Sequence, residues 1–133
     1  MHKLVGLAAV AAAVAVAVAG AAVAAPPKKG GRYEGALYAT SAVTLKKKVR
    51  LVVDRSGTSM RVLWWCGEGR PPSTLIVKIA ADGSFAGNSN VGGTLTVWSI
   101  KGRFLTPAKA RASLQLKTTC DGKGGTLDLP LRR

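Results

Sequence analysis

The stretch VTLKKKVRLVVDRSGTSMRVLWWC, residues 43–66, decides the fold of this chain. Two runs rich in Val, Leu and Trp flank the polar segment at residues 54–58, an arrangement typical of an antiparallel β-hairpin. When Val53 lies opposite Met60, antiparallel pairing fixes the partners of the other side chains on that face. These partners are Leu51 with Val62, Val49 with Trp64, and Lys47 with Cys66. Because this face is mostly apolar and carries a cysteine, we predict that it faces the core.

The opposite face of the same hairpin is basic. It pairs Val52 with Arg61, Arg50 with Leu63, and Lys48 with Trp65. Successive side chains of a strand point to opposite faces of the sheet, so the two adjacent tryptophans separate. We predict that Trp64 is buried and that Trp65 lies on the outer face.

The rest of the chain repeats this pattern of short apolar runs broken by Gly, Asp, Asn and Pro. We expect strands over residues 33–40, 43–53, 59–66, 74–81, 94–104, 112–120 and 126–131. Turn signals recur roughly every ten residues, so we predict an all-β fold, an antiparallel sandwich or small barrel of about seven strands. Residues 106–111 are expected to form one helical turn, and residues 88–93 a polar connection. Alternation also predicts that Leu114 and Leu116 join Leu51, Val62 and Trp64 in the core.

The first 24 residues have the organisation of a secretory signal peptide. A positive start at Met1-His2-Lys3 precedes an apolar run at residues 4–19, and Ala22-Val23-Ala24 supplies the small residues of a cleavage site. The alternative is an uncleaved membrane anchor, because residues 4–25 are long enough to span a bilayer. The run is mostly alanine, which gains little on transfer to lipid, so we expect no stable transmembrane anchor. The protein is thus predicted to be secreted or envelope-associated, with a signal-peptide helix removed.

The predicted mature chain is one small domain behind a short linker. Residues 25–32 (APPKKGGR) have no hydrophobic period and are expected to be a basic, flexible tether. Residues 33–133 are long enough for one β-domain with its own core and too short for two.

Charge is the strongest indication of a partner. The chain has 20 Lys and Arg against six Asp and Glu, a formal charge of +14. Such an excess favours anionic partners outside the cell: a cell-wall polymer, a polysaccharide or lipid headgroups, with nucleic acid bound only non-specifically. The alternative is a solubilising coat with no specific partner.

Two cysteines, Cys66 and Cys120, remain after the signal peptide. An even count in an exported chain predicts a disulfide, here with one possible pairing. A metal site is the alternative, but two thiolates without a mature histidine fall short of the four ligands that zinc prefers. We expect no metal and no cofactor.

Catalytic residues are not apparent. The only histidine, His2, lies in the signal peptide, which removes the commonest general base. Glu34 and Asp128 are the two carboxylates expected in strands, and as a pair they would suit a glycosidase only if they met at about 5–9 Å. The glycine-rich residues 121–125 suggest a phosphate loop, but a strand is expected to follow, which favours a hairpin connection.

The remaining candidate is a binding site on the outer face of the first hairpin. Basic side chains interleaved with an exposed aromatic ring suit stacking on a sugar or base together with pairing to anionic groups. The residues concerned are Lys46, Lys48, Arg50, Arg61 and Trp65, beside Leu63. The alternative is that a second layer covers Trp65 and the charges are simply solvated. We therefore expect a non-catalytic binding or structural module; the alternative is an extracellular hydrolase with an unrecognised Ser- or carboxylate-based site.

Several strand-and-turn segments also resemble a known group of proteins. These are residues 31–35 (GRYEG), 82–85 (DGSF), 101–104 (KGRF) and 120–122 (CDG). In them the chain resembles the uncharacterised small exported all-β domain proteins of high-GC bacteria. The resemblance implies an exported sandwich or barrel and carries no activity with it.

Overall fold

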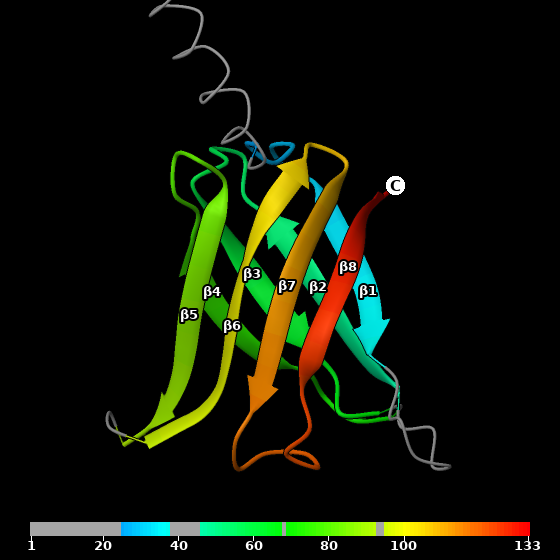
Figure 1. Ribbon diagram of the computed structural model, residues 1–133, viewed down its shortest axis with the longest axis vertical. Helices are drawn as coiled ribbons and strands as arrows, with labels where there is room; N and C mark the ends of the chain where they lie inside the picture. Colours follow the sequence, from blue (N-terminus) through cyan, green and yellow to red (C-terminus); the bar gives the residue numbers. More distant parts are fainter. Residues whose placement is uncertain (1–24, 38–45, 68, 93–94) are drawn as a thin grey trace, which may run out of the picture.

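The computed structural model describes residues 25–37, 46–67, 69–92 and 95–133, and within these ranges the chain is all-β, with no helix. The strands are β1 (Arg32–Leu37), β2 (Lys47–Val53), β3 (Ser59–Trp64), β4 (Ser73–Lys78), β5 (Ser84–Val91), β6 (Leu95–Thr106), β7 (Lys109–Leu116) and β8 (Gly125–Arg132). They form one antiparallel sheet in the order β4-β3-β2-β1-β8-β7-β6-β5 (Figure 1). The predicted all-β fold is confirmed.

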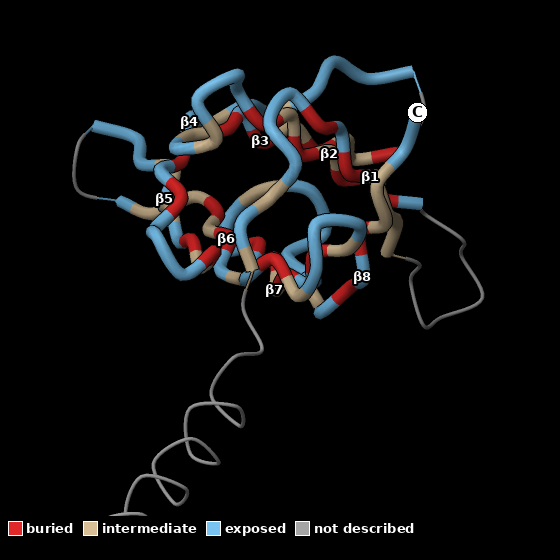
Figure 2. Tube along the Cα trace, turned by 90° about the horizontal axis from the view of Figure 1, so that it is seen from above, coloured by how far each residue is buried: buried red, intermediate tan, exposed pale blue. Residues whose placement is uncertain are grey.

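The sheet curls into a nearly closed barrel (Figure 2). The first and last strands lie side by side, with Tyr33 opposite Leu131, so the ladder continues across both ends of the sequence. The sheet's two edges are β4 and β5, which meet at a single bridge between Ile79 and Phe85. Of the two architectures expected, the barrel is the one formed, with eight strands rather than about seven.

The additional strand is β5, which includes part of the expected connection at residues 88–93. Gly87 and the polar residues after it have low strand propensity, which is why the sequence pattern missed them. They are held by pairing with β6, which begins with Ser84 opposite Arg103 and continues through Asn88 opposite Ser99. Pairing with β6 therefore outweighs the low strand propensity of these residues.

The helical turn expected at residues 106–111 is wrong. Thr106 ends β6, Lys109 begins β7, and the two pair across a tight hairpin connection. The amide of Ala108 donates to the Thr106 hydroxyl at 3.1 Å, which fixes the turn. Pro107 suits this because its fixed φ is compatible with a β-turn as well as with a helix start.

Residues 25–31, expected to be flexible, are hydrogen-bonded across one end of the barrel (Figure 1, blue segment). The amide of Ala25 donates to the Phe104 carbonyl at 2.7 Å, and that of Gly30 to the Asp54 carbonyl at 3.0 Å. The buried Tyr33 hydroxyl accepts from the Lys28 amide at 2.9 Å. Carbonyls at the barrel end thus give this segment partners that its own composition does not reveal. The predicted signal peptide lies outside the described residues, among which no helix is long and apolar enough to cross a membrane.

Side chains fill the barrel interior, and the first hairpin has the predicted register. Val53 pairs with Met60, Leu51 with Val62, and Val49 with Trp64. All five side chains expected in the core are buried: Leu51, Val62, Trp64, Leu114 and Leu116. Aromatic rings pack at both ends, with ring centroids 4.9 Å apart for Tyr33 and Phe104 and 5.8 Å apart for Trp64 and Trp98. The barrel is therefore a packed core.

The other end of the barrel is closed by the connection between β7 and β8. Cys66 and Cys120 form the predicted disulfide, with their Cα atoms 5.7 Å apart. On the core-facing side of β2, Lys47 is only 2% exposed, and its Nζ donates to Asp121 Oδ2 at 2.8 Å and to the Lys123 carbonyl at 3.0 Å. A buried cation is stable only with such partners. The disulfide and the ion pair together hold this connection against the end of the first hairpin.

Removing the carboxylate of Asp121 should lower the free energy of unfolding more than removing the buried charge of Lys47. Asp121→Asn leaves the Lys47 ammonium buried without its counter-ion, and we expect a loss of about 2 kcal/mol in the free energy of unfolding, reduced from fully buried cases by the 31% exposure of the Asp121 side chain. Lys47→Met removes the charge and keeps the length, so a smaller loss is expected. Urea unfolding of both variants measures this, and equal losses would contradict it.

The same pair gives a pH dependence. The hydrogen bond from Lys47 holds the pKa of Asp121 below its ordinary value. A depressed carboxyl pKa contributes stability that is fully present above the unfolded-state value of about 3.9. This contribution is lost as the pH falls through the lower folded-state pKa. Asp121→Asn should therefore flatten the acid limb of the stability curve.

Candidate functional site

Trp65 directly follows the last residue of β3 and continues the register of the hairpin by one step. Its amide donates to the Lys48 carbonyl at 2.9 Å. Alternation therefore turns its ring to the outer face, while the ring of Trp64 is only 1% exposed. The predicted separation of the two tryptophans is confirmed: Trp64 is buried and Trp65 is partly exposed.

Two cations from β2 lie against the Trp65 ring. The Nζ of Lys48 is 5.2 Å from the ring centroid, and the Cζ of Arg50 is 5.0 Å from it. Both distances are within the range of cation–π attraction. In the described part of the chain no second sheet covers this face, because all eight strands belong to the one barrel. Trp65 is thus framed by basic side chains of its own hairpin.

A pocket of about 290 Å³ opens beside this ring. It is lined by Lys46, Lys48, Trp65, Gly67, Gly69 and Arg70, and we call it the Trp65 pocket. Gly67 and Gly69 have φ values of 87° and 77°, in the left-handed region that favours glycine. Their lack of side chains makes part of the wall from backbone. Among the described residues that line the pocket, three are cations and none is acidic.

The predicted site residues are only partly brought together. Lys46, Lys48 and Trp65 line the pocket, and Arg50 lies over the ring. Arg61 is on the same face, but four residues of extended strand separate it from Trp65, about 13 Å. It is paired with Val52 and does not line the pocket.

Sequence reasoning missed Arg70 and the two glycines. The signal available was the Gly-rich spacing after Cys66, since a segment fixed at one end by a disulfide stays near the end of its strand. Nothing in the local pattern, however, shows the direction in which that segment turns.

Arg50 also pairs with an acidic neighbour. Its Nε donates to Glu34 Oε2 at 2.6 Å. Burial raises the pKa of Glu34. The hydrogen bond and the charge of Arg50 lower it by more than burial raises it, so the pKa lies below its ordinary value. Glu34 therefore stays ionised and holds the guanidinium against the ring.

Three carboxylates of the described residues are held by hydrogen-bonding partners that favour their ionised form. Glu34 is bound to Arg50, and Asp128 accepts a hydrogen bond from Arg111 Nε at 2.8 Å that lowers its pKa. The turn carboxylate Asp54 has its pKa lowered to about 2 by the hydroxyl hydrogen bonds of Ser59 and Ser56. A general acid needs a raised pKa, which none of these three groups has. The described ranges also hold no cluster of three His, Cys, Asp or Glu that could bind a metal.

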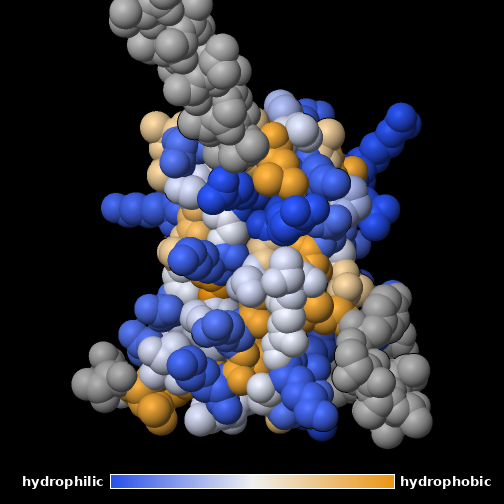
Figure 3. Space-filling model, viewed as in Figure 1, coloured by the Kyte–Doolittle hydropathy of each residue, from blue (hydrophilic) through white to orange (hydrophobic). Residues whose placement is uncertain are grey.

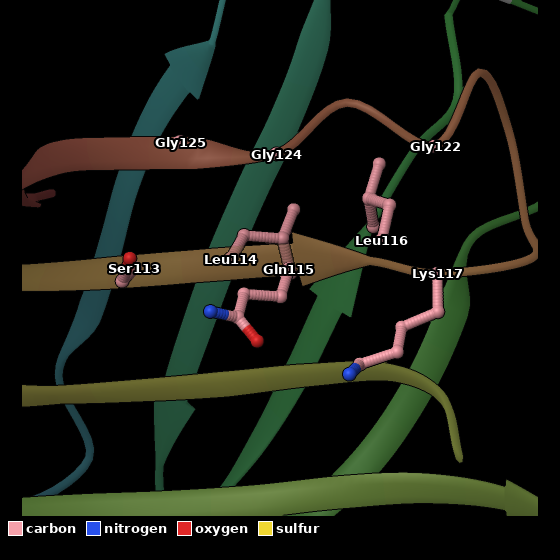
Figure 4. Close-up of a pocket in the computed structure, with 8 residues that line it drawn as sticks. All are labelled: Ser113, Leu114, Gln115, Leu116, Lys117, Gly122, Gly124 and Gly125. Atoms are coloured by element: carbon pink, nitrogen blue, oxygen red, sulfur yellow. The ribbon is translucent and has the colours of Figure 1, made fainter. Parts of the chain in front are cut away.

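Residues 121–124 of the glycine-rich segment lie in the connection between β7 and β8, and Gly125 begins β8, as the hairpin interpretation predicted. A depression of about 600 Å³ lies beside them, and Figure 4 shows Gln115 and Lys117 extending from the same side of β7 within it. A strand follows, where a phosphate loop requires a helix. The Lys123 amide is already bonded to Asp121 Oδ1 at 2.9 Å, so this backbone is not a preformed phosphate cradle.

Comparison with known proteins adds no relative: no family model matches the chain, and no curated protein matches its sequence. The resemblance to exported β-domains therefore stays a prediction, and the function rests on the site itself.

Proposed function

We propose that the protein is a non-catalytic binding module of the cell envelope that holds anionic polymers at the Trp65 pocket. The observation that carries this proposal is the stacking of Lys48 and Arg50 on Trp65 beside a pocket with two further cations. Charge attracts the polymer, and the pocket gives one anionic unit a defined place.

Each part of the pocket has a chemical task in this proposal. The planar guanidinium of Arg70 can bind a carboxylate or phosphate through two parallel hydrogen bonds. The part of the Trp65 ring left uncovered by Lys48 and Arg50 offers an apolar surface to a sugar ring. The glycine wall lets the ligand approach backbone amides closely. The site thus favours an anionic group carried on a ring, as in an acidic polysaccharide.

The proposed location outside the cytoplasm has two supports. The N-terminal residues have the pattern of a signal peptide. The Cys66–Cys120 disulfide is of the kind that persists in oxidising compartments. Neither concerns the ligand, which must be tested directly.

Binding to heparin, as the acidic polysaccharide probe, should weaken steeply between about 50 and 200 mM salt because counterions are released. The double variant Lys48→Gln/Arg70→Gln should lower the affinity about tenfold and reduce the slope of log K against log salt by about one for each cation. Calorimetric titration at several salt concentrations measures both quantities. The matched control is Arg55→Gln/Arg61→Gln, which removes the same charge outside the pocket.

Trp65→Ala separates a site from a diffuse basic surface. If a sugar ring packs on Trp65, the variant should weaken heparin binding by about 1–3 kcal/mol, the value for base stacking on an aromatic ring. The proposal would be contradicted if the pocket variant and the matched control lost equal heparin affinity and Trp65→Ala had no effect. This face would then be only part of a diffuse basic surface.

A further inference from the structure

The barrel carries a second basic surface on the side away from the Trp65 pocket. Figure 2 shows β2 and β3 on one side of the ring and β6 and β7 on the other. Over β5–β8, four depressions of about 540, 490, 230 and 600 Å³ share lining residues. Lys101 lines three of them, and so does Ser113. We call these adjoining depressions together the β6–β7 trough.

The trough exists because small side chains align across four strands. Ala86 pairs with Lys101, Lys101 with Ser113, and Ser113 with Thr126. Ala86, Ser113 and Thr126 carry only one to three side-chain heavy atoms, so the row is low except at Lys101, whose exposed side chain stands within it. Rows on a strand face are about 6.7 Å apart, which makes the hollow roughly the width of one missing row of large side chains.

Cations border this low row. On one side the next row places Arg103 beside Arg111, and Lys117, the residue after β7, lines the one depression that runs along the end of that strand, about 13 Å of extended chain from Ser113. Arg111 is engaged by Asp128, which leaves Lys101, Arg103 and Lys117 as the main source of positive potential. Figure 3 shows this face, on which strongly hydrophilic side chains project among paler ones and patches of hydrophobic surface. A linear polyanion laid along the low row would meet Lys101 and Arg103, and it would meet Lys117 where it continues along the end of β7.

Of the residues that line the four depressions, Phe85 alone is aromatic, and it is only 4% exposed. The aromatic residues of β5 and β6 are Phe85, Trp98 and Phe104, and all three are buried in the core. A sugar or a base therefore finds no ring to stack on, in contrast to the Trp65 pocket. Recognition here relies on charge and on a narrow, shallow channel.

We propose that the β6–β7 trough binds a linear, ring-free phosphate polymer, so that the two faces of the barrel take anionic chains of different chemistry. This proposal rests on the proposed function, that the protein binds anionic polymers, and adds a second site and ligand class to it. The thin phosphate chain fits a channel one side-chain row wide, and its closely spaced charges match the neighbouring cations.

The test uses long-chain inorganic polyphosphate as the probe. Lys101→Gln/Arg103→Gln/Lys117→Gln should lower the affinity for polyphosphate about tenfold or more, since three contacts that release counterions are lost. The charge-matched control is Arg55→Gln/Arg61→Gln/Arg132→Gln, and its effect should be clearly smaller. Heparin binding should follow the opposite order of sensitivity, responding to the pocket variant more than to the trough variant.

A steric variant tests the trough without changing any charge. Ser113→Tyr fills the middle of the low row and should also lower polyphosphate affinity about tenfold, because the chain loses its close approach to the cations. Thr74→Tyr, on the exposed outer face of β4, is the matched control and should bind normally. Unfolding midpoints of both tyrosine variants establish that the barrel is intact.

The outcomes separate the two proposals. If polyphosphate binds but the trough variants behave like their controls, or if Trp65→Ala weakens it as much as they do, the trough is not the site and this inference is overturned. If neither heparin nor polyphosphate binds, the proposed function fails as well. Loss of polyphosphate binding confined to the trough variants supports the inference.

Discussion

Trp64→Ala should lower the free energy of unfolding by about 3–5 kcal/mol, the range for removing a large aromatic side chain from a core. Trp64 is among the largest fully buried side chains, it pairs with Val49 across the hairpin, and its ring lies edge-on to Trp98. Alanine would leave a cavity between strands on both sides of the barrel, which a closed sheet cannot easily collapse. Urea unfolding followed by far-ultraviolet circular dichroism measures the loss.

Two further variants show whether packing is the cause. Trp64 Nε1 is buried without a hydrogen-bond partner among the described residues. Trp64→Phe therefore removes an unsatisfied donor while keeping much of the ring, and its loss should be clearly smaller than that of alanine. Trp65→Ala, on the outer face, should cost about 1 kcal/mol, mainly the cation–π contacts. A larger loss for Trp65→Ala than for Trp64→Ala would mean that the hairpin register is shifted by one residue.

The sequence was sufficient for this hairpin because its information is local. Strict alternation on both sides of a short turn leaves one register that buries the apolar side chains, and the structure has that register. Closure of the sheet depends on a contact between distant segments, Tyr33 opposite Leu131. No local pattern distinguishes that pairing from a sandwich, so both architectures remained open.

The missed strand β5 and the wrongly expected flexibility of residues 25–31 also come from contacts between distant segments. Strand β5 contains Gly87, which lowers strand propensity, yet the absence of a side chain there admits Val77 and Leu75 from the facing edge. The segment at residues 25–31 lacks any hydrophobic period, and its order comes from carbonyls at the barrel end. In both cases tertiary partners determine a conformation that composition alone does not predict.

The residues of the candidate sites also differ in whether local sequence or tertiary structure brings them together. Lys48, Arg50 and Trp65 were predictable because one hairpin places them on one face. Arg70 lies outside the strands, between β3 and β4, so its contribution could not be predicted. The trough could not be predicted at all. Its low row consists of one residue from each of four strands, and the sequence does not show the order of those strands in the sheet.

Replacing both cysteines, Cys66→Ala/Cys120→Ala, should lower the free energy of unfolding by about 4 kcal/mol. The cysteines are 54 positions apart, and a cross-link of that length restricts the unfolded chain by this amount on the loop-entropy estimate. The bond also holds the connection that carries Asp121 against Lys47, so the variant should weaken that ion pair too. Urea unfolding of the oxidised protein and of the double variant measures the difference.

The same variant should affect the two proposed sites unequally. Cys66 directly precedes the segment that brings Gly67, Gly69 and Arg70 to the Trp65 pocket, whereas Lys101, Arg103 and Ser113 lie within β6 and β7 and are held by strand pairing. Loss of the disulfide should therefore weaken heparin binding more than polyphosphate binding, measured under conditions where the variant is folded. Equal weakening of both would indicate that the bond supports the barrel as a whole, and unchanged heparin binding would show that Gly67, Gly69 and Arg70 keep their place without it.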